Sequence, residues 1–364
     1  MTASTSTDGG DLTGLRVLAV HAHPDDESLW TGTALAQCAR RGAEVTVVTC
    51  TLGEEGEVIG DRYRMLESGG TGMLGGYRIA ELREALRELG VNRDDSGLHR
   101  PLFLGGAGRW RDSGMAGTPA ADHPRAFVRS GEEAVAALGE IIDVRRPHVV
   151  VTYGPDGGYG HPDHIRAHEV THAAVDAAVT RRDAAGENTA DEAAGAAGAD
   201  GANGAAGADR PWVPALILWA VTDRTDLEEG LARLDGPPTG WRMPDPGELA
   251  SVPSTDVDLH ITGTDADVSA KRRAMAAHAT QLWVADGTPT DVIGEVRRTS
   301  PPGETAFCLS NLVVQPLLRT EAYTVGGRDP GDPRRADVLV DMLRFGATDE
   351  NRLFCLSVEG RRRT

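Results

Sequence analysis

Short apolar runs alternate with longer amphipathic runs along the first half of the chain. Residues 15–21 (LRVLAVH), 44–50 (EVTVVTC) and 148–153 (HVVVTY) are almost continuously apolar and rich in Val and Leu. Runs of this length and composition are typical of strands that are buried on both faces of a sheet. Residues 101–104 and 214–221 have a similar character. The pattern predicts a strand in each of these segments.

Between these strands, apolar residues recur at the three- and four-residue spacing of helices that bury one face. Residues 79–89 stop at Gly90, and glycine commonly closes a helix by adopting left-handed backbone angles. Residues 130–133 (SGEE) have the form of a capping box, which would open a helix that runs to about Arg145. Helices are predicted over residues 27–41, 79–89, 130–145, 164–179 and 268–283.

The alternation of apolar strands with helices predicts the α/β class, with a Rossmann-like three-layer sandwich and a mostly parallel sheet. Ligands of such sheets bind beyond the carboxyl ends of the strands. The polar segment 21–27 (HAHPDDE) directly follows the first predicted strand, and residues 154–164 (GPDGGYGHPDH) follow the strand at 148–153. Two segments that are distant in sequence are therefore expected to meet at one edge of the sheet.

The chain is expected to form a single domain over residues 13–364, preceded by a disordered segment at 1–12. A Rossmann-like core over 13–182 is followed by an Ala/Gly/Asp-rich stretch at 183–209. This stretch has too little apolar surface to order itself and is interpreted as a flexible insertion, with a helix as the alternative. Pro and Gly predict loops at 236–253 and 326–333, within the remaining part of the domain, 210–364.

Composition and charge exclude several classes of protein. The formal net charge is -18, which argues against a basic surface for nucleic acid and disfavours an anionic polymer as the substrate. Hydrophobic residues make up 40% of the chain and aromatic residues only 4%, so the core must consist mainly of aliphatic side chains.

Cysteine usage and the lack of long apolar segments indicate a cytoplasmic protein. The chain has four cysteines and no Cys-x-x-Cys pair, which argues against a disulfide framework. The polar N-terminal residues lack the apolar segment of a signal peptide. The sequence also lacks an apolar run of the ~18 residues that a membrane-spanning helix needs.

The segment after the first strand contains residues suited to metal binding. Zinc prefers imidazole nitrogen and carboxylate oxygen at about 2.0–2.2 Å. His23 and Asp26 are three residues apart in a turn, so both can reach one ion. Asp25 would lie near the ion but not on it, where a general base for water is needed. The alternative is that Asp25 or Asp26 only caps the following helix.

The second segment supplies what the first one lacks. His164 can be the third protein ligand, and three protein ligands leave one position free, as in catalytic zinc sites. His161 would lie close to the reacting water, where a protonated imidazole can stabilise an oxyanion or protonate the leaving amine. Asp163 could fix the tautomer of one of these histidines. The alternative is a polar helix N-terminus, but the same residue types after two strands of one sheet favour the metal site.

Other catalytic patterns are weaker. His164, His168 and His172 share one face of a helix and form a rival metal set, but no acidic partner is fixed beside them, so packing is the preferred role of the last two. His21 is interpreted as a residue that packs behind the site. The sequence has neither a Gly-x-Ser-x-Gly elbow nor a Gly-x-Gly-x-x-Gly loop after the first strand, and Cys38 and Cys50 have no obvious histidine partner.

The HPDDE and HPDH motifs together resemble the LmbE-like (PIG-L) family of zinc deacetylases and amidases. Residues 49–63, 74–82, 104–118 and 146–164 resemble, more specifically, the branch of this family that acts in mycothiol biosynthesis. The resemblance is dense over about residues 15–180 and thin afterwards, apart from the segment KRRAMAAHATQL. It implies the LmbE-like deacetylase fold and hydrolysis of the acetamide of an N-acetylated amino sugar linked to inositol, N-acetylglucosaminyl-inositol.

The resemblance also implies a role for individual residues. Tyr159 would be a mobile residue that reaches the reaction centre, and His161, supported by Asp163, would stabilise the oxyanion or act as the acid. Arg78 and Asp112 would hold the hydroxyls of sugar and inositol, with a surface salt bridge as the alternative. The implied zinc ligands and the base are those reasoned above, namely His23, Asp26 and His164, with Asp25 as the base.

Two further functions stay open at this point. A sister branch cleaves mycothiol S-conjugates at a related amide and shares the metal site. A non-catalytic carbohydrate-binding module on the same fold would bind the sugar without releasing acetate.

One Zn²⁺ ion per subunit is expected as the cofactor, although Fe²⁺ accepts a two-histidine, one-carboxylate set as well. The expected partner is a small molecule, with no nucleic acid and no membrane.

Overall fold

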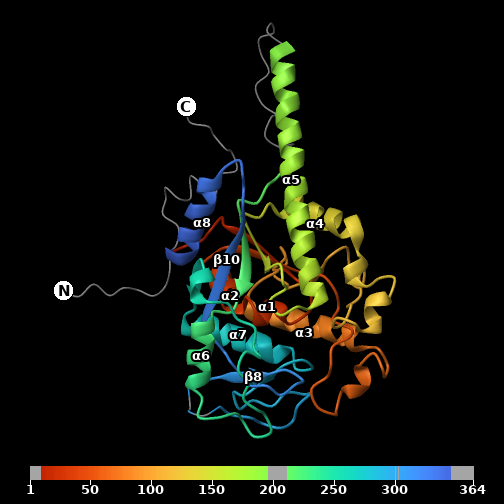
Figure 1. The fold of residues 1–364 in the computed structure, drawn as a ribbon, viewed down its shortest axis with the longest axis vertical. Coiled ribbons are helices and arrows are strands. Elements are labelled where there is room, and N and C mark those ends of the chain that lie inside the picture. The colour runs from red at the N-terminus through yellow and green to blue at the C-terminus, as the bar shows by residue number, and fades with distance from the viewer. Residues whose placement is uncertain (1–9, 196–210, 300, 302, 346–364) are drawn as a thin grey trace, which may run out of the picture.

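A seven-stranded sheet forms the centre of the molecule (Figure 1). The computed structural model describes residues 10–195, 211–299, 301 and 303–345. The strand order is β3-β2-β1-β4-β5-β10-β6; the first five strands are parallel, whereas β10 is antiparallel to both β5 and β6. The predicted α/β class and mostly parallel sheet are therefore confirmed. The strands are β1 (Arg16–His21), β2 (Glu44–Thr49), β3 (Leu102–Phe103), β4 (Val149–Tyr153), β5 (Leu216–Val221), β6 (Leu259–Thr262) and β10 (Thr320–Arg328).

Helices cover both faces of the sheet, and the alternation of side chains along β1 shows how. Val17 and Ala19 pack into a core shared with α2, α3 and α8, while Leu18 and Val20 face a second core shared with α4 and α5. The helices are α1 (Asp26–Leu29), α2 (Gly32–Arg40), α3 (Leu74–Leu89), α4 (Gly131–Arg145), α5 (Pro162–Gly195), α6 (Arg224–Ala232), α7 (Asp265–Ala277) and α8 (Pro333–Phe345), with short 3-10 turns at Arg64–Leu66, Pro119–Asp122, Phe127–Arg129 and Ser254–Asp256.

The helix predicted at 27–41 is wrong as a single element, because the chain breaks it at Thr31 into α1 and α2. The Thr31 hydroxyl forms a hydrogen bond with His21 Nε2 at 2.9 Å and does not cap α2. The first turn of α2 is capped by the Glu321 carboxylate, which accepts the amide protons of Thr33 and Ala34 at 2.8 and 2.9 Å. A cap from a residue so distant in sequence leaves no local signal.

The helix predicted at 130–145 is present as α4, but its predicted cap and the bounds of the last predicted helix need correction. The capping box at 130–133 is wrong, because the Ser130 hydroxyl makes no cap to α4 and instead accepts a hydrogen bond from Arg166 Nε. The helix predicted at 268–283 is α7, which starts earlier and ends at Ala277. A capping box is present there, between the Thr264 hydroxyl and the Asp267 carboxylate.

The stretch interpreted as a flexible insertion at 183–209 is helical in its first part, since α5 continues to Gly195 and extends away from the sheet (Figure 1). The Ala content outweighs the helix-weakening effect of the glycines up to that point. Residues 196–210 lie outside the described residues.

The loop predicted at 326–333 is also partly wrong, because β10 runs to Arg328 with a bulge between Val325 and Gly327.

The expectations for the N-terminal segment, the cysteines and membrane-spanning helices can also be compared with the structure. Residues 1–9 of the segment expected to be disordered lie outside the described residues, whereas Leu12 is fully buried in the core, so the ordered domain begins before residue 13. Cys38, Cys50 and Cys308 are buried free thiols, and Cys355 lies outside the described part. Among the helices that the structure describes, none is both long and apolar enough to cross a membrane.

A smaller antiparallel sheet lies beside the main one, with the strand order β7-β8-β9. Its strands are β7 (Trp283–Val284), β8 (Ala306–Cys308) and β9 (Gln315–Pro316). Phe307, Gln315 and Pro316 from this sheet line a cleft of about 700 Å³, which is also lined by His23, Asp25 and Asp26. The second half of the chain therefore contributes to the same cavity as the HPDDE segment.

Candidate active site

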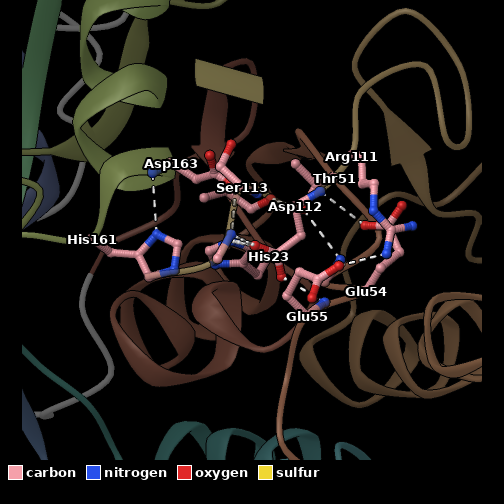
Figure 2. A network of polar contacts seen from close by, with 12 residues as sticks. His23, Thr51, Glu54, Glu55, Arg111, Asp112, Ser113, His161 and Asp163 are labelled. Atoms are coloured by element: carbon pink, nitrogen blue, oxygen red, sulfur yellow. Dashed lines mark hydrogen bonds and ion pairs between the residues drawn. The ribbon is translucent and has the colours of Figure 1, made fainter. Parts of the chain in front are cut away.

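The two histidine-containing segments meet because β1 and β4 are neighbours in the sheet. Both strands run in the same direction, so the chain leaves both at the same edge. The chain continues from β1 to β2 on one side, while β4 lies on the other side, which makes the β1/β4 boundary a switch point where a crevice opens. Figure 2 shows the outcome: His23 from the first segment lies beside His161 and Asp163 from the second.

Three of the predicted ligands converge on one point. His23 Nδ1 lies 3.3 Å from His164 Nε2 and 3.5 Å from Asp26 Oδ2, and His164 Nε2 lies 3.4 Å from Asp26 Oδ1. An ion that holds tetrahedral ligands at about 2.0–2.2 Å separates those ligand atoms by about 3.3–3.6 Å. The three side chains are buried, and their closest donor distances, which reach the two different oxygens of Asp26, are of the size of that edge, so this donor set fits a metal ion.

The other nitrogen of each histidine predicted as a ligand contacts a second group. His164 Nδ1 lies 3.1 Å from the Gly157 carbonyl, to which it donates when Nε2 is the free, metal-facing nitrogen. His23 Nε2 lies 3.3 Å from the Asp163 carboxylate and 3.5 Å from the Asp112 carboxylate (Figure 2). Carbonyl and carboxylate partners of this kind fix the tautomer and orientation of metal-binding histidines.

The side chain of Asp163 does not contact His161, which it was expected to support, but contacts His23 instead. Its carboxylate accepts from His23 and from the Ser113 amide at 2.9 Å, whereas His161 is contacted only by the backbone of Asp163, whose N–H donates to His161 Nδ1 at 3.1 Å. The side chain of Asp163 therefore supports a predicted metal ligand, and its amide orients His161.

His161 is expected in the protonated form from its sequence context, and the structure favours the neutral one. Burial, reinforced by the neighbouring His23 and His164, lowers the pKa of His161 to about 3. Because Nδ1 accepts the Asp163 amide proton, Nε2 carries the hydrogen of the neutral ring and can donate it. His161 also lines the cleft, so a hydrogen-bond donor, not a cation, faces the ligand there.

Asp25, the predicted base, lines the same cleft as the predicted metal ligands His23 and Asp26. It is almost fully buried, and its carboxylate forms a 3.0 Å ion pair with Arg78. Burial raises the pKa of Asp25 to about 6, with Arg78 opposing the rise. Arg78 also donates to the carbonyls of Pro24 and Gly53, and is itself buried. The alternative of a surface salt bridge is therefore wrong for Arg78.

Asp112 is buried as well, so the surface alternative is wrong for it too. It lines the cleft and accepts the Gly114 amide at 2.8 Å. The neighbouring loop holds it in place: Glu54 accepts the Asp112 amide at 3.0 Å, and Glu55 pairs with Arg111 at 2.5 Å (Figure 2). The carboxylate of Asp112 thus lies beside the predicted ligand His23 and lines the cleft.

Tyr159 lines the cleft and is half exposed. Its ring is nearly parallel to that of Trp30, with 6.4 Å between centroids, and its centroid is 6.1 Å from that of His161. The neighbouring Gly158 has a positive φ, and a Cβ there would lie 2.6 Å from the Trp30 ring, so only glycine lets the segment approach this closely.

The rival metal set is not assembled. His168 Nδ1 lies 3.0 Å from the Tyr153 carbonyl, and His172 Nε2 accepts the indole N–H of Trp219 at 3.0 Å. Their rings pack against Trp219, with centroids 5.3 and 5.8 Å from it. Both contacts agree with the packing role preferred for these two histidines, and only His164 of the three faces the convergence point.

Tyr153 is a residue of the site that sequence reasoning missed. This fully buried last residue of β4 donates its hydroxyl proton to Asp26 at 2.7 Å and accepts the Ala22 amide at 2.8 Å. Its ring stacks on His164, with centroids 4.1 Å apart. His21 lies 3.3 Å from the same hydroxyl, which agrees with its interpretation as a residue behind the site. A tyrosine that ends a buried strand just before a ligand loop is the only sequence signal that could have indicated this role.

Replacing Tyr153 with phenylalanine is expected to weaken metal binding about 10- to 100-fold, because partners of metal ligands typically contribute that much. Competition with a chromogenic chelator measures the dissociation constant. Tyr323→Phe is the matched control, since Tyr323 is equally buried and donates to Glu321 at 3.1 Å, far along the chain from the ligands. Equal affinities in the wild type and the Tyr153 variant would remove Tyr153 from the support of Asp26.

The fold and the site together define a class of protein: an α/β protein with a candidate site for one metal ion at the carboxyl edge of its sheet. The comparison with known families agrees, and the chain belongs to the PIG-L family, whose model is described as GlcNAc-PI de-N-acetylase and matches residues 18–175. The expected family and the expected enzyme class, a hydrolytic N-deacetylase, are thereby confirmed.

Curated relatives are similar over most of the chain. A protein of Corynebacterium jeikeium (strain K411) is 50% identical over 88% of this chain and 93% of its own length. One from Corynebacterium efficiens is 51% identical over 87% of this chain and 89% of that protein, and one from Rhodococcus opacus (strain B4) is 47% identical over 88% and 94%. All three are named 1D-myo-inositol 2-acetamido-2-deoxy-alpha-D-glucopyranoside deacetylase.

Proposed function

We propose that this protein hydrolyses the N-acetyl group of 1D-myo-inositol 2-acetamido-2-deoxy-α-D-glucopyranoside, giving glucosaminyl-inositol and acetate, as a step of mycothiol biosynthesis. One observation supports the chemistry: His23, Asp26 and His164 converge with donor atoms 3.3–3.5 Å apart, beside a cleft that is lined by His23, Asp26 and Asp25. The names of relatives that are about half identical over most of both chains supply the substrate.

We assign Zn²⁺ to this site, because two imidazoles and one carboxylate with one position left open form the usual ligand set of catalytic zinc. Fe²⁺ would also accept these donors. When bound, such an ion acts as a Lewis acid that makes water more acidic and polarises the acetamide carbonyl. Asp26 Oδ1 is the freer oxygen for this contact, since Oδ2 already accepts from Tyr153 and from the His23 amide.

The chain's own residues then handle the protons and the charge. Asp25 takes the proton of the attacking water, with its carboxylate held in place by Arg78. His161 donates its Nε2 hydrogen to the carbonyl oxygen as that oxygen gains negative charge. The proton that Asp25 has taken up is available for the leaving amine. Arg78 and Asp112 line the cleft beside these groups and, in this proposal, direct hydrogen bonds to the hydroxyls of the sugar and inositol.

Acetate release tests the proposed function. The purified protein is expected to release acetate from N-acetylglucosaminyl-inositol, to lose this activity when a chelator removes the metal, and to regain it with Zn²⁺. A mycothiol S-conjugate, assayed beside it, is expected to be cleaved more slowly at equal concentration. Binding of the sugar without acetate release would identify a carbohydrate-binding module instead, and faster cleavage of the S-conjugate would assign the chain to the amidase branch.

The remaining expectations are not decided by this site. The substrate of the proposed reaction is a small molecule, which agrees with the size of the cleft, about 700 Å³. The cytoplasmic location and the division of the chain into a core, an insertion and a C-terminal part stay predictions.

A further inference from the structure

The backbone of Asp25 has an unusual conformation. Four non-glycine residues of the described part have a positive φ, and in three of them it lies between 48° and 57°, near the ordinary left-handed well. Asp25 differs, with φ 127° and ψ -29°. Such backbone angles are unfavourable for a residue with a side chain and persist only where the surroundings impose them. Something must therefore hold the main chain of the residue that we propose as the base.

Glu27 provides this restraint. Its Oε2 accepts the Asp25 amide proton at 3.0 Å, and its Oε1 accepts the Ser28 hydroxyl at 2.6 Å. Glu27 is fully buried and is not among the residues that line the cleft. Its carboxylate thus contacts the main chain at Asp25, while Arg78 contacts the side chain of the same residue. The two contacts together fix where the carboxylate of Asp25 points.

Glu27 is in turn fixed by the second half of the chain. His278, which follows the last residue of α7, places Nε2 2.7 Å from Glu27 Oε1, and both side chains are fully buried. The turn after α7 is hydrogen-bonded to α3, because the amide and the hydroxyl of Thr280 both donate to the Glu81 carboxylate, at 2.8 and 2.7 Å. A chain of buried contacts thus runs from α3 and α7 through His278 and Glu27 to Asp25.

We propose that Glu27 and His278 are positioning residues for the reaction: they hold the strained main chain of Asp25 so that its carboxylate faces the reacting water. This inference rests on the proposed function, in which Asp25 is the base. The alternative is that the pair only stabilises the fold, as a buried ion pair between α1 and α7. The two explanations differ in what they predict for turnover when Asp25 itself is changed.

Turnover and substrate affinity separate the two roles. Glu27→Ala is expected to lower kcat for acetate release about 100-fold, the cost of a small misplacement of a catalytic group, and to leave KM and zinc affinity within about threefold. Glu27→Gln retains a carbonyl oxygen for the Asp25 amide and is expected to restore most of the turnover. Thr171→Val is the control: Thr171 is also fully buried, but its hydroxyl donates to the Ala167 carbonyl within α5 at 2.7 Å, outside this chain of contacts, so kcat is expected to stay unchanged.

A double-mutant cycle with Asp25→Asn gives a readout that a purely structural role would not move. If Glu27 acts through Asp25, adding Glu27→Ala to the Asp25→Asn variant lowers the residual kcat less than about threefold. If the pair only stabilises the fold, the full loss caused by Glu27→Ala recurs in that background, and the proposal is overturned. Wild-type protein that releases no acetate would instead contradict the proposed function, a result distinct from either of these.

His278 variants keep the proposal testable should Glu27→Ala fail to fold. His278→Leu fills a similar volume but cannot donate to Glu27, and it is expected to lower kcat about tenfold with metal content unchanged. His278→Gln restores a donor and is expected to recover much of that loss. Equal kcat values for both variants and the wild type would show that the contact does not position Asp25, and so would a crystal structure of the leucine variant with φ of Asp25 unchanged.

Discussion

Replacing Asp25 with asparagine is expected to lower kcat for acetate release by about 10³-fold while the protein still binds one equivalent of zinc. A positioned general base typically accelerates a reaction 10²- to 10⁴-fold, and asparagine cannot take up a proton. It keeps the size of aspartate and an oxygen that can accept from Arg78, so the loop should retain its shape. The convergence of His23, Asp26 and His164 does not involve the Asp25 side chain.

Steady-state kinetics together with the zinc content of the purified variant measure this prediction. Asp223→Asn is the matched control, because Asp223 is another buried carboxylate of the same cleft, whose partners are Thr225, Ser254 and His260. Its kcat is expected to stay within about twofold of the wild type. An Asp25 variant with near wild-type kcat would remove Asp25 from the role of base, and one without zinc would show that the loop, not the proton transfer, had been lost.

Local sequence pattern and sheet geometry were enough to predict that the two histidine-containing segments lie together. Apolar runs located β1 and β4, and the rule that ligands bind at the carboxyl ends of parallel strands brought His23 and His164 to the same edge. The residue types then indicated a metal. This inference needs no knowledge of distant contacts, because the sheet itself brings the two segments together.

Contacts between side chains that are distant in sequence could not be predicted, since tertiary packing alone decides them. The Glu321 carboxylate that caps α2 comes from β10, and it explains why a continuous helical pattern is broken at Thr31. The Asp163 carboxylate turns to His23, because the Ser113 amide holds it there. Tyr153 resembles any apolar residue of a buried strand until its hydroxyl is seen to donate to Asp26.

Two histidines one helical turn apart on α5 provide the sharpest test of the metal site. Replacing His164 with alanine removes one of the three proposed ligands, whose closest donor atoms lie 3.3–3.5 Å apart, and zinc affinity is expected to fall at least 100-fold. His168→Ala removes an imidazole that lies against the Tyr153 carbonyl and Trp219, and zinc affinity is expected to stay within about threefold.

Activity should follow the metal in this pair of variants. At a zinc concentration that saturates the wild type, His164→Ala is expected to lose at least 99.9% of the turnover, about the 10³-fold effect expected when water is no longer activated. His168→Ala is expected to lose only what a smaller side chain costs in stability, which thermal unfolding reports separately. The reverse pattern, with zinc retained in the His164 variant and lost in the His168 variant, would place the ion at His168, one turn further along α5. His164 would then not be the third ligand, and the proposed site at the HPDDE segment would be contradicted.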